Sequence, residues 1–172
     1  MMSKTDGTIE LVRYDPSWAN KFEVERKRLE ASIGDFIYGS IEHVGSTAVT
    51  DLKAKPIIDI MVGVETLEAS KPAISILATL GYCHSPYKAD VMHWFCKPSP
   101  QYRTHHLHLI PYQSDLWKDR IKFRDILRRD KNIAKKYEVL KLNLAEKYKA
   151  DRDRYTKEKW PFVKNVLLTQ NV

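Results

Sequence analysis

The sequence predicts an α/β (α+β) fold, in which a mixed β-sheet is flanked by helices and followed by a C-terminal helical segment. Up to Pro111, short runs rich in β-branched residues alternate with helical patterns, as is typical of layered domains that combine both structures. After Pro111 the pattern is helical throughout. No repeat or linker-like tract interrupts the chain. We therefore expect a single domain over residues 1–172, with a sheet core at about 8–111 and a helical part at about 112–170.

The N-terminal part contains a helix and then a strand that ends abruptly. The helix is expected to begin at Asp15 or Ser17, either of which can cap it, and to end at Gly34. A strand is expected within residues 36–44, and the Gly-Ser-Thr sequence at 45–47 interrupts it. This break places three small residues directly at the end of a strand.

The rest of the chain continues this alternation and then becomes helical. Residues 56–62 form an almost unbroken apolar run that favours a strand buried on both faces. We expect a helical turn at 48–54, a helix at 67–80, strands at 82–87, 92–97 and 104–110, and helices near 114–130, 132–149 and 151–169. Pro161 should kink the last helix or begin a new one.

Composition indicates a cytoplasmic protein that does not enter a membrane. No apolar run approaches the roughly 20 residues that a membrane helix needs. The segment from Met1 to Glu10 is polar and mixed in charge, unlike a signal peptide. Cys83 and Cys96 have no metal-binding spacing. We expect both to be reduced thiols packed near the core.

The net charge of +7 is concentrated in the C-terminal third of the chain. Of the 29 lysine and arginine residues, 16 lie between Lys118 and Lys159, with 8 of the 22 acidic residues. Such a concentration attracts polyanionic ligands, although a solvated basic helix surface would have the same composition. Nucleic acid is therefore a conceivable partner, but no nucleic-acid-binding motif supports it. No pattern indicates an oligomeric state.

A Gly-Ser turn followed by a strand-borne carboxylate is the densest chemical signal. Ser46 and Thr47 can cap a short helix, whose amides and hydroxyls would favour phosphate. Asp59 then lies in an apolar strand, where an unpaired carboxylate is costly unless a partner or a metal ion compensates it. One interpretation is a nucleotide–metal site. The alternative is an ordinary capped turn, with Asp59 satisfied by Lys55 or by a backbone amide.

These residues resemble the GrpB family, which has a nucleotidyltransferase-like fold. The family pattern contains His-Val/Ile-Gly-Ser-Thr, Lys-Pro-Ile-Ile-Asp-Ile and His-Leu-His elements, which match residues 43–47, 55–60 and 106–108. The resemblance covers roughly residues 8–168. In the wider superfamily the Gly-Ser turn holds nucleotide phosphates, which implies transfer of a nucleotidyl group from a nucleoside triphosphate to an acceptor. Related domains are fused to dephospho-CoA kinases, so a non-catalytic module that binds a nucleotide or a CoA-related ligand is the alternative.

The expected metal site departs from the superfamily pattern. There, two acids at positions i and i+2 of the strand hold divalent metals; Asp59 matches the first, but Met61 stands at the second. The candidate ligands for a single metal ion are therefore Asp59, Glu42, His43, His106 and His108. The superfamily implies Mg²⁺ or Mn²⁺, whereas mixed imidazole and carboxylate ligands favour Mn²⁺ or Zn²⁺ over Mg²⁺. The histidines could equally line a polar sheet face without metal.

The remaining candidates are residues for catalysis and residues that would contact a phosphorylated ligand. Asp59 and His108 are the catalytic candidates, since a histidine can act as a general base. A metal-dependent phosphohydrolase would use the same residues. The candidate contacts for a nucleotide or other phosphorylated small molecule are Gly45, Ser46, Thr47, Lys55 and Arg103, with Lys118, Lys122 and Arg124 as a further wall. Trp94 either packs in the core or stacks on a base.

Overall fold

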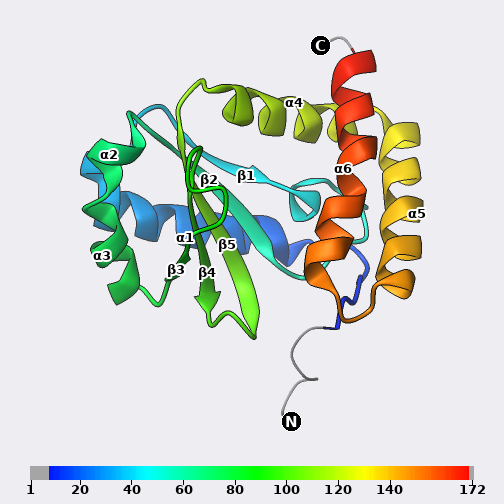
Figure 1. The fold of residues 1–172 in the computed structure, drawn as a ribbon, viewed down its shortest axis with the longest axis horizontal. Coiled ribbons are helices and arrows are strands. Elements are labelled where there is room, and N and C mark those ends of the chain that lie inside the picture. The colour runs from blue at the N-terminus through cyan, green and yellow to red at the C-terminus, as the bar shows by residue number, and fades with distance from the viewer. Residues whose placement is uncertain (1–7, 171–172) are drawn as a thin grey trace.

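The computed structural model describes residues 8–170, which form a five-stranded mixed sheet with helices on both faces (Figure 1). The strands are β1 (Ile41–Val44), β2 (Ile58–Val64), β3 (Cys83–Ser85), β4 (His93–Pro98) and β5 (Arg103–Pro111). Their order is β1-β2-β5-β4-β3, in which β2 and β5 are parallel and the other pairs antiparallel. The predicted α/β (α+β) class is confirmed. The prediction that residues 1–10 are not a signal peptide concerns a segment of which residues 1–7 lie outside the described residues.

Six α-helices and two short 3₁₀ turns complete the described part of the chain. They are α1 (Ser17–Ile33), α2 (Leu67–Ser70), α3 (Ala73–Thr79), α4 (Asp115–Arg129), α5 (Lys131–Lys147), α6 (Arg152–Thr169), η1 (Gly34–Phe36) and η2 (Ser46–Ala48). The side chains of Ser114, Asp130 and Asp151 accept backbone hydrogen bonds at the starts of α4, α5 and α6. None of the helices within residues 8–170 is both long enough and apolar enough to cross a membrane.

Several elements differ from the sequence-based expectations. The helix expected at 67–80 is divided into α2 and α3, and Pro72 precedes the first residue of α3, as suits a residue without a backbone N–H. The strand expected within 36–44 begins only at Ile41, because the 3₁₀ turn η1 extends to Phe36. The helical turn expected at 48–54 is instead η2, which includes Ser46. Pro161 lies inside α6, which continues past it without restarting.

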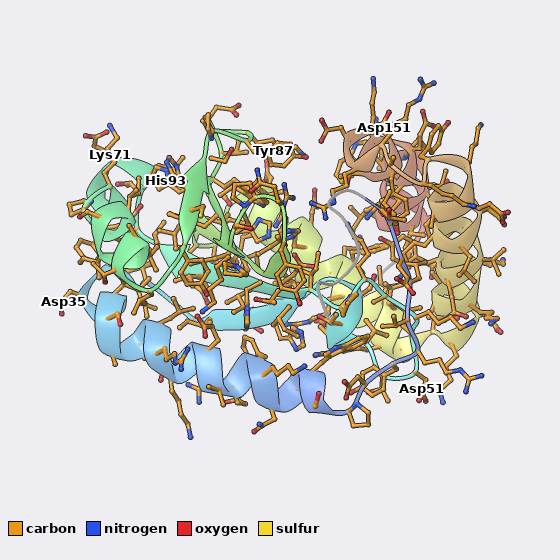
Figure 2. All side chains as sticks on the ribbon, turned by 90° about the horizontal axis from the view of Figure 1, so that it is seen from below. Asp35, Asp51, Lys71, Tyr87, His93 and Asp151 are labelled. Atoms are coloured by element: carbon orange, nitrogen blue, oxygen red, sulfur yellow. The ribbon has the colours of Figure 1, made fainter. Side chains whose placement is uncertain are left out.

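One face of the sheet carries the main hydrophobic core. Alternate residues of β2 and β5 point to this face and are buried: Ile58, Ile60, Val62, Val64, Leu107 and Leu109. They pack against α1 through Trp18 and Leu29, and against α3 through Leu77. Figure 2 shows α1 running along the underside of the sheet. This face is therefore occupied by packing.

The opposite face is covered by α4, and α5 and α6 stand beside one end of the sheet (Figure 1). Met61, Ile110 and Trp117 form a second buried cluster under α4. A third cluster joins the three C-terminal helices to residues that follow the Gly-Ser turn, through Leu52 and Tyr137 among others. This packing brings the basic C-terminal helices next to the turn and to the start of β2.

Candidate functional site

A row of paired residues that includes Asp59, His106 and two cysteines crosses the sheet on the face that α4 covers. The register pairs Asp59 with Val44 and His106, and His106 with Cys96, which in turn pairs with Cys83. Directly paired residues point to the same side of a sheet. Both cysteines are free thiols. The neighbouring row contains Glu42, Met61, His108 and Trp94. The register therefore brings Asp59, His106 and His108 together.

The Asp59 carboxylate contacts both histidines. Nδ1 of His106 lies 3.1 Å from Oδ1 of Asp59, within hydrogen-bonding distance, and Nε2 of His108 lies 3.7 Å from the same oxygen. Burial opposes ionisation of this carboxyl, but the contacts with the two histidines outweigh it and hold the pKa of Asp59 well below its usual range. The Asp59 side chain is 26% exposed. The site therefore presents an ionised carboxylate that solvent can reach.

His108 is held from its other side by Arg120 of α4. One guanidinium nitrogen of Arg120 donates to Nδ1 of His108 at 2.9 Å. Because a guanidinium can only donate, Nδ1 accepts and Nε2 carries the proton that faces Asp59. Burial and the charge of Arg120 lower the pKa of His108 to about 3. Since both ring nitrogens are engaged, His108 is suited to orienting Asp59.

His106 has a free ring nitrogen. Its Nε2 is the one side-chain nitrogen or oxygen atom of residues 8–170 that is buried without a hydrogen-bond partner. Since Nδ1 donates to the Asp59 carboxylate, the tautomer with a single ring proton carries its lone pair on Nε2. The Trp94 ring lies beside it, with centroids 5.2 Å apart. A histidine oriented by a carboxylate is the usual arrangement of a general base, so the geometry favours His106 over His108 for that role.

The turn after β1 lies against Asp59 because its first residue is a glycine. Gly45 has φ 73° and ψ −175°, a conformation that side chains rarely adopt. A Cβ added at Gly45 would clash with the Asp59 carboxylate. Ser46 then accepts a hydrogen bond at its Oγ from Nζ of Lys141, at 2.9 Å. The turn thus joins the Ser46 hydroxyl to a lysine amine, directly after the glycine that lies against the ionised carboxylate.

Glu42 and His43 have partners of their own, and the structure does not bring His43 to Asp59. The His43 ring stacks on Phe22 of α1, on the opposite face of the sheet, with centroids 4.8 Å apart. Its Nε2 is hydrogen-bonded to Oγ1 of Thr47 at 2.9 Å, and burial lowers the pKa of His43 to about 4. Glu42 accepts a hydrogen bond from Arg124 of α4 at 2.7 Å.

Three lysines from separate segments lie close enough to repel one another, and we call Lys55, Lys141 and Lys159 the lysine cluster. The amines of Lys55 and Lys159 lie 5.1 and 4.5 Å from the centroid of the same ring, that of Tyr155. Burial lowers the pKa of all three, to about 7 for Lys141 and for Lys159. Repulsion from Lys55 adds to this for Lys141 and Lys159, and repulsion from Arg152 and Arg103 adds to it for Lys55. Within the described residues, none of the three forms an ion pair with a carboxylate.

Lys141 and Lys159 are absent from the sequence-based candidates, although the sequence contains a signal for each. Lys141 lies four residues after Tyr137, and Lys159 lies four residues after Tyr155. Residues four apart share one face of a helix, and both tyrosines are buried. A lysine at the next position of a buried stripe is therefore directed toward the interior.

The other predicted phosphate contacts are spread more widely. Nε of Arg103 donates to the carbonyl of Pro100 at 2.8 Å, and its guanidinium lies 5.2 Å from the centroid of the Trp94 ring. Thr47 points away from Asp59 and donates to the carbonyl of Ile57 at 3.3 Å. Of the wall residues, Lys122 donates to the carbonyl of Leu167, Arg124 pairs with Glu42 and Lys118 is exposed.

The residues present do not fit a two-metal centre. Met61, at the position of the second acid, is fully buried and packs with Trp117. In the part of the chain that the structure describes, no three His, Cys, Asp or Glu side chains are arranged to hold a metal ion. Glu42 is already paired with Arg124. The predicted single-metal site at Asp59 and the histidines stays a prediction.

Comparisons with known proteins point to one family. The family model described as GrpB protein matches residues 8–168. The chain is 40% identical to the glutamate-rich protein GrpB of Alkalihalophilus pseudofirmus, over 97% of this chain and 98% of that protein. It is 34% identical to a UPF0157 protein of Deinococcus radiodurans, over 95% and 83% of the two chains. The crystal structure of the conserved protein GrpB from Enterococcus faecalis superposes with a TM-score of 0.82 at 30% identity, covering 92% of this chain and 98% of that one.

Proposed function

Because the chain belongs to the GrpB family, and because its lysine cluster lies beside the Gly-Ser turn of that family, we propose that it binds the phosphates of a nucleoside triphosphate or of a similar phosphorylated small molecule. The observation that carries this proposal is the grouping of Lys55, Lys141 and Lys159 beside the turn, where Asp59 and Glu138 attract these amines without forming an ion pair with them. No carboxylate among the described residues pairs with these amines, and burial depresses the pKa of each.

A phosphate chain would supply the paired negative charge that no carboxylate of the described residues provides to these lysines. Desolvated ammonium groups that repel one another are stabilised when an anion of high charge density lies between them. Charge-assisted hydrogen bonds to phosphate oxygens are stronger than those between neutral groups. The Ser46 hydroxyl, which already accepts a hydrogen bond from Lys141, can donate its own proton to a phosphate oxygen. The proposed contacts are therefore the lysine cluster and Ser46.

Calorimetric titration with inorganic triphosphate and with ATP, in the absence of added metal, tests the proposal. We expect both to bind, and we expect Lys141→Gln to weaken triphosphate binding at least about tenfold, which corresponds to roughly 1.4 kcal/mol. Lys136 is exposed on the same helix, so Lys136→Gln makes the same charge change as a matched control. Absence of triphosphate binding, or an equal loss in both variants, would contradict the proposal.

Nucleotidyl transfer is a second candidate, favoured by the free Nε2 of His106. In this scheme Nε2 takes the proton of an acceptor hydroxyl, and the acceptor oxygen forms a bond to the α-phosphorus. The bond from the α-phosphorus to the bridging oxygen breaks, and pyrophosphate leaves. We expect pyrophosphate release from one of the four common nucleoside triphosphates in the presence of small hydroxyl acceptors. Release should be lost in His106→Gln but kept in the exposed-site control His84→Gln. Binding without release by any donor would instead identify a non-catalytic module.

A further inference from the structure

Two half-exposed aromatic residues share one lysine. Tyr87, between β3 and β4, is 44% exposed, and Trp160, on α6, is 48% exposed. The amine of Lys88 lies 5.7 Å from the centroid of the Tyr87 ring and 5.4 Å from the centroid of the larger Trp160 ring. These distances are those of cation–π contacts. The lysine therefore lies close to two rings from segments that are distant in the sequence.

Lys88 is held in this place under two unfavourable conditions. Its backbone has φ 49°, a left-handed conformation that is costly for a residue with a Cβ. Burial and the charge of Arg120 lower the pKa of Lys88, so the surroundings disfavour its ammonium form. A neutral ring in the same space would not meet this electrostatic cost. Lys88 is therefore suited to being displaced by such a ring.

The Tyr87 ring is connected to the His106 side chain through Trp94, and Trp160 is the neighbour of Lys159 along the chain. Trp160 directly follows Lys159 along α6, and the Tyr87 ring contacts the Trp94 ring edge to face, with centroids 6.1 Å apart. Trp94 in turn lies beside His106. Figure 2 shows Tyr87 on the same side of the molecule as Asp151, which caps the start of α6. A chain of ring contacts thus runs from Tyr87 through Trp94 to His106.

We propose that Tyr87 and Trp160 form a slot for the base of a nucleotide, and that Lys88 fills this slot in the ligand-free protein. This inference rests on the proposed phosphate site, because the phosphates of the same ligand would lie against the lysine cluster. Stacking on aromatic side chains accepts any base, since every base has a π-face. The slot should therefore distinguish nucleotides from inorganic polyphosphate more strongly than it distinguishes one base from another.

Titration calorimetry of the full-length protein with ATP and with inorganic triphosphate tests the slot. We expect ATP to bind about fivefold to a hundredfold more tightly than triphosphate, as base stacking allows. Tyr87→Ala and Trp160→Ala should lose this preference without changing the affinity for triphosphate, and Trp160→Phe should keep most of it. Lys88→Ala should increase the preference, because it removes the occupant. Leu168→Ala, at a 75% exposed position of the same helix, is the matched control and should behave as the unmodified protein.

The possible failures can be told apart. If ATP and triphosphate bind equally tightly, the slot is overturned and the phosphate site stands. If Trp160→Ala keeps the preference for ATP, the base stacks elsewhere and the slot is again overturned. If Lys88→Ala leaves the preference unchanged or weakens it, Lys88 does not occupy the slot. If neither compound binds, both the slot and the proposed function are wrong.

Discussion

Oδ1 of Asp59 lies 3.1 Å from Nδ1 of His106, its direct partner on the neighbouring parallel strand. This contact gives the two histidines of the His-Leu-His element different roles. His106 donates through Nδ1 and keeps a free Nε2, whereas His108 is engaged by Arg120 and faces the same carboxylate. A single carboxylate thus contacts two imidazoles and lies near Lys55 and Lys159.

Removing the charge of Asp59 should strengthen phosphate binding. The ionised carboxylate lies close enough to the lysine cluster to interact electrostatically with it, so it also repels a bound polyphosphate. We expect Asp59→Asn to bind inorganic triphosphate about tenfold more tightly, a gain of roughly 1.4 kcal/mol, measured by calorimetry without metal. Asp35→Asn, at an exposed site on η1, makes the same change in net charge and should have little effect.

The metal dependence of binding gives a separate prediction. If the lysines and Ser46 hold the phosphates, the increase in melting temperature caused by triphosphate should persist in the presence of EDTA. Mg²⁺, Mn²⁺ or Zn²⁺ should then add to this increase only through Asp59 and the histidines, so Asp59→Asn should abolish any metal-dependent part. A thermal shift that appears only with metal would contradict lysine-based binding. A metal-dependent shift kept by Asp59→Asn would place the metal elsewhere.

Phosphate affinity should fall as the pH rises through about 7 to 9. The pKa of Lys141 and that of Lys159 are about 7 in the free protein, and a bound anion raises them, so binding takes up protons in this range. Titrations in two buffers with different ionisation enthalpies should reveal this uptake. The double variant Lys141→Met/Lys159→Met should show far less of it, and Lys136→Met should match the unmodified protein. An affinity independent of pH would contradict the prediction.

The same lysines should make the ligand-free protein gain stability with increasing pH. Their pKa is about 7 in the folded chain and near 10.5 in the unfolded one, so between these values the unfolded chain binds more protons. The free energy of unfolding contributed by the lysines therefore rises with pH across this range. Urea unfolding at several pH values checks this, because the rise should be smaller in Lys141→Met. A contribution that falls with pH would contradict the lowered pKa values.

Gly45→Ala should damage both the stability and the site. The positive φ disfavours any Cβ, and here the Cβ would also clash with the Asp59 carboxylate, so we expect a loss of roughly 2–4 kcal/mol in urea unfolding. Gly34→Ala is the matched control, since Gly34 has φ −50° and no atom within 4 Å of an added Cβ. That substitution should be neutral or stabilising by up to about 1 kcal/mol. Equal effects of the two substitutions would refute this account of the turn.

The local parts of the fold were predictable because they depend on short-range patterns. The apolar run at 56–62 overlaps most of β2 (Ile58–Val64), and the His-Leu-His element lies in β5 with its two histidines on one face, as period-two alternation requires. The division of the helix expected at 67–80 into α2 and α3 was harder to predict from the sequence. Its apolar spacing continues across Pro72, and only the absence of a backbone N–H at that proline argues for a new start.

The direction of each candidate side chain could not be read from its motif. Glu42 and His43 are adjacent in β1, so they point to opposite faces, but the motif does not say which face carries the site. The register decides this: Val44 pairs with Asp59, so Glu42 shares the face of Asp59 and His43 packs against α1. One shift in register would have exchanged them.

By itself, the sequence determined the fold class, the Gly-Ser turn, the strand-borne Asp59 and the resemblance to the GrpB family. Each depends on residues that are close together in the chain, or on a pattern of strands and helices. The tertiary structure decided which nitrogen of which histidine is free, and it brought Lys141 to Ser46, 95 residues away in the chain. Burial, hydrogen-bond partners and pKa are properties of the packed surroundings, so chemistry that depends on them exists only once the helices have packed against the sheet.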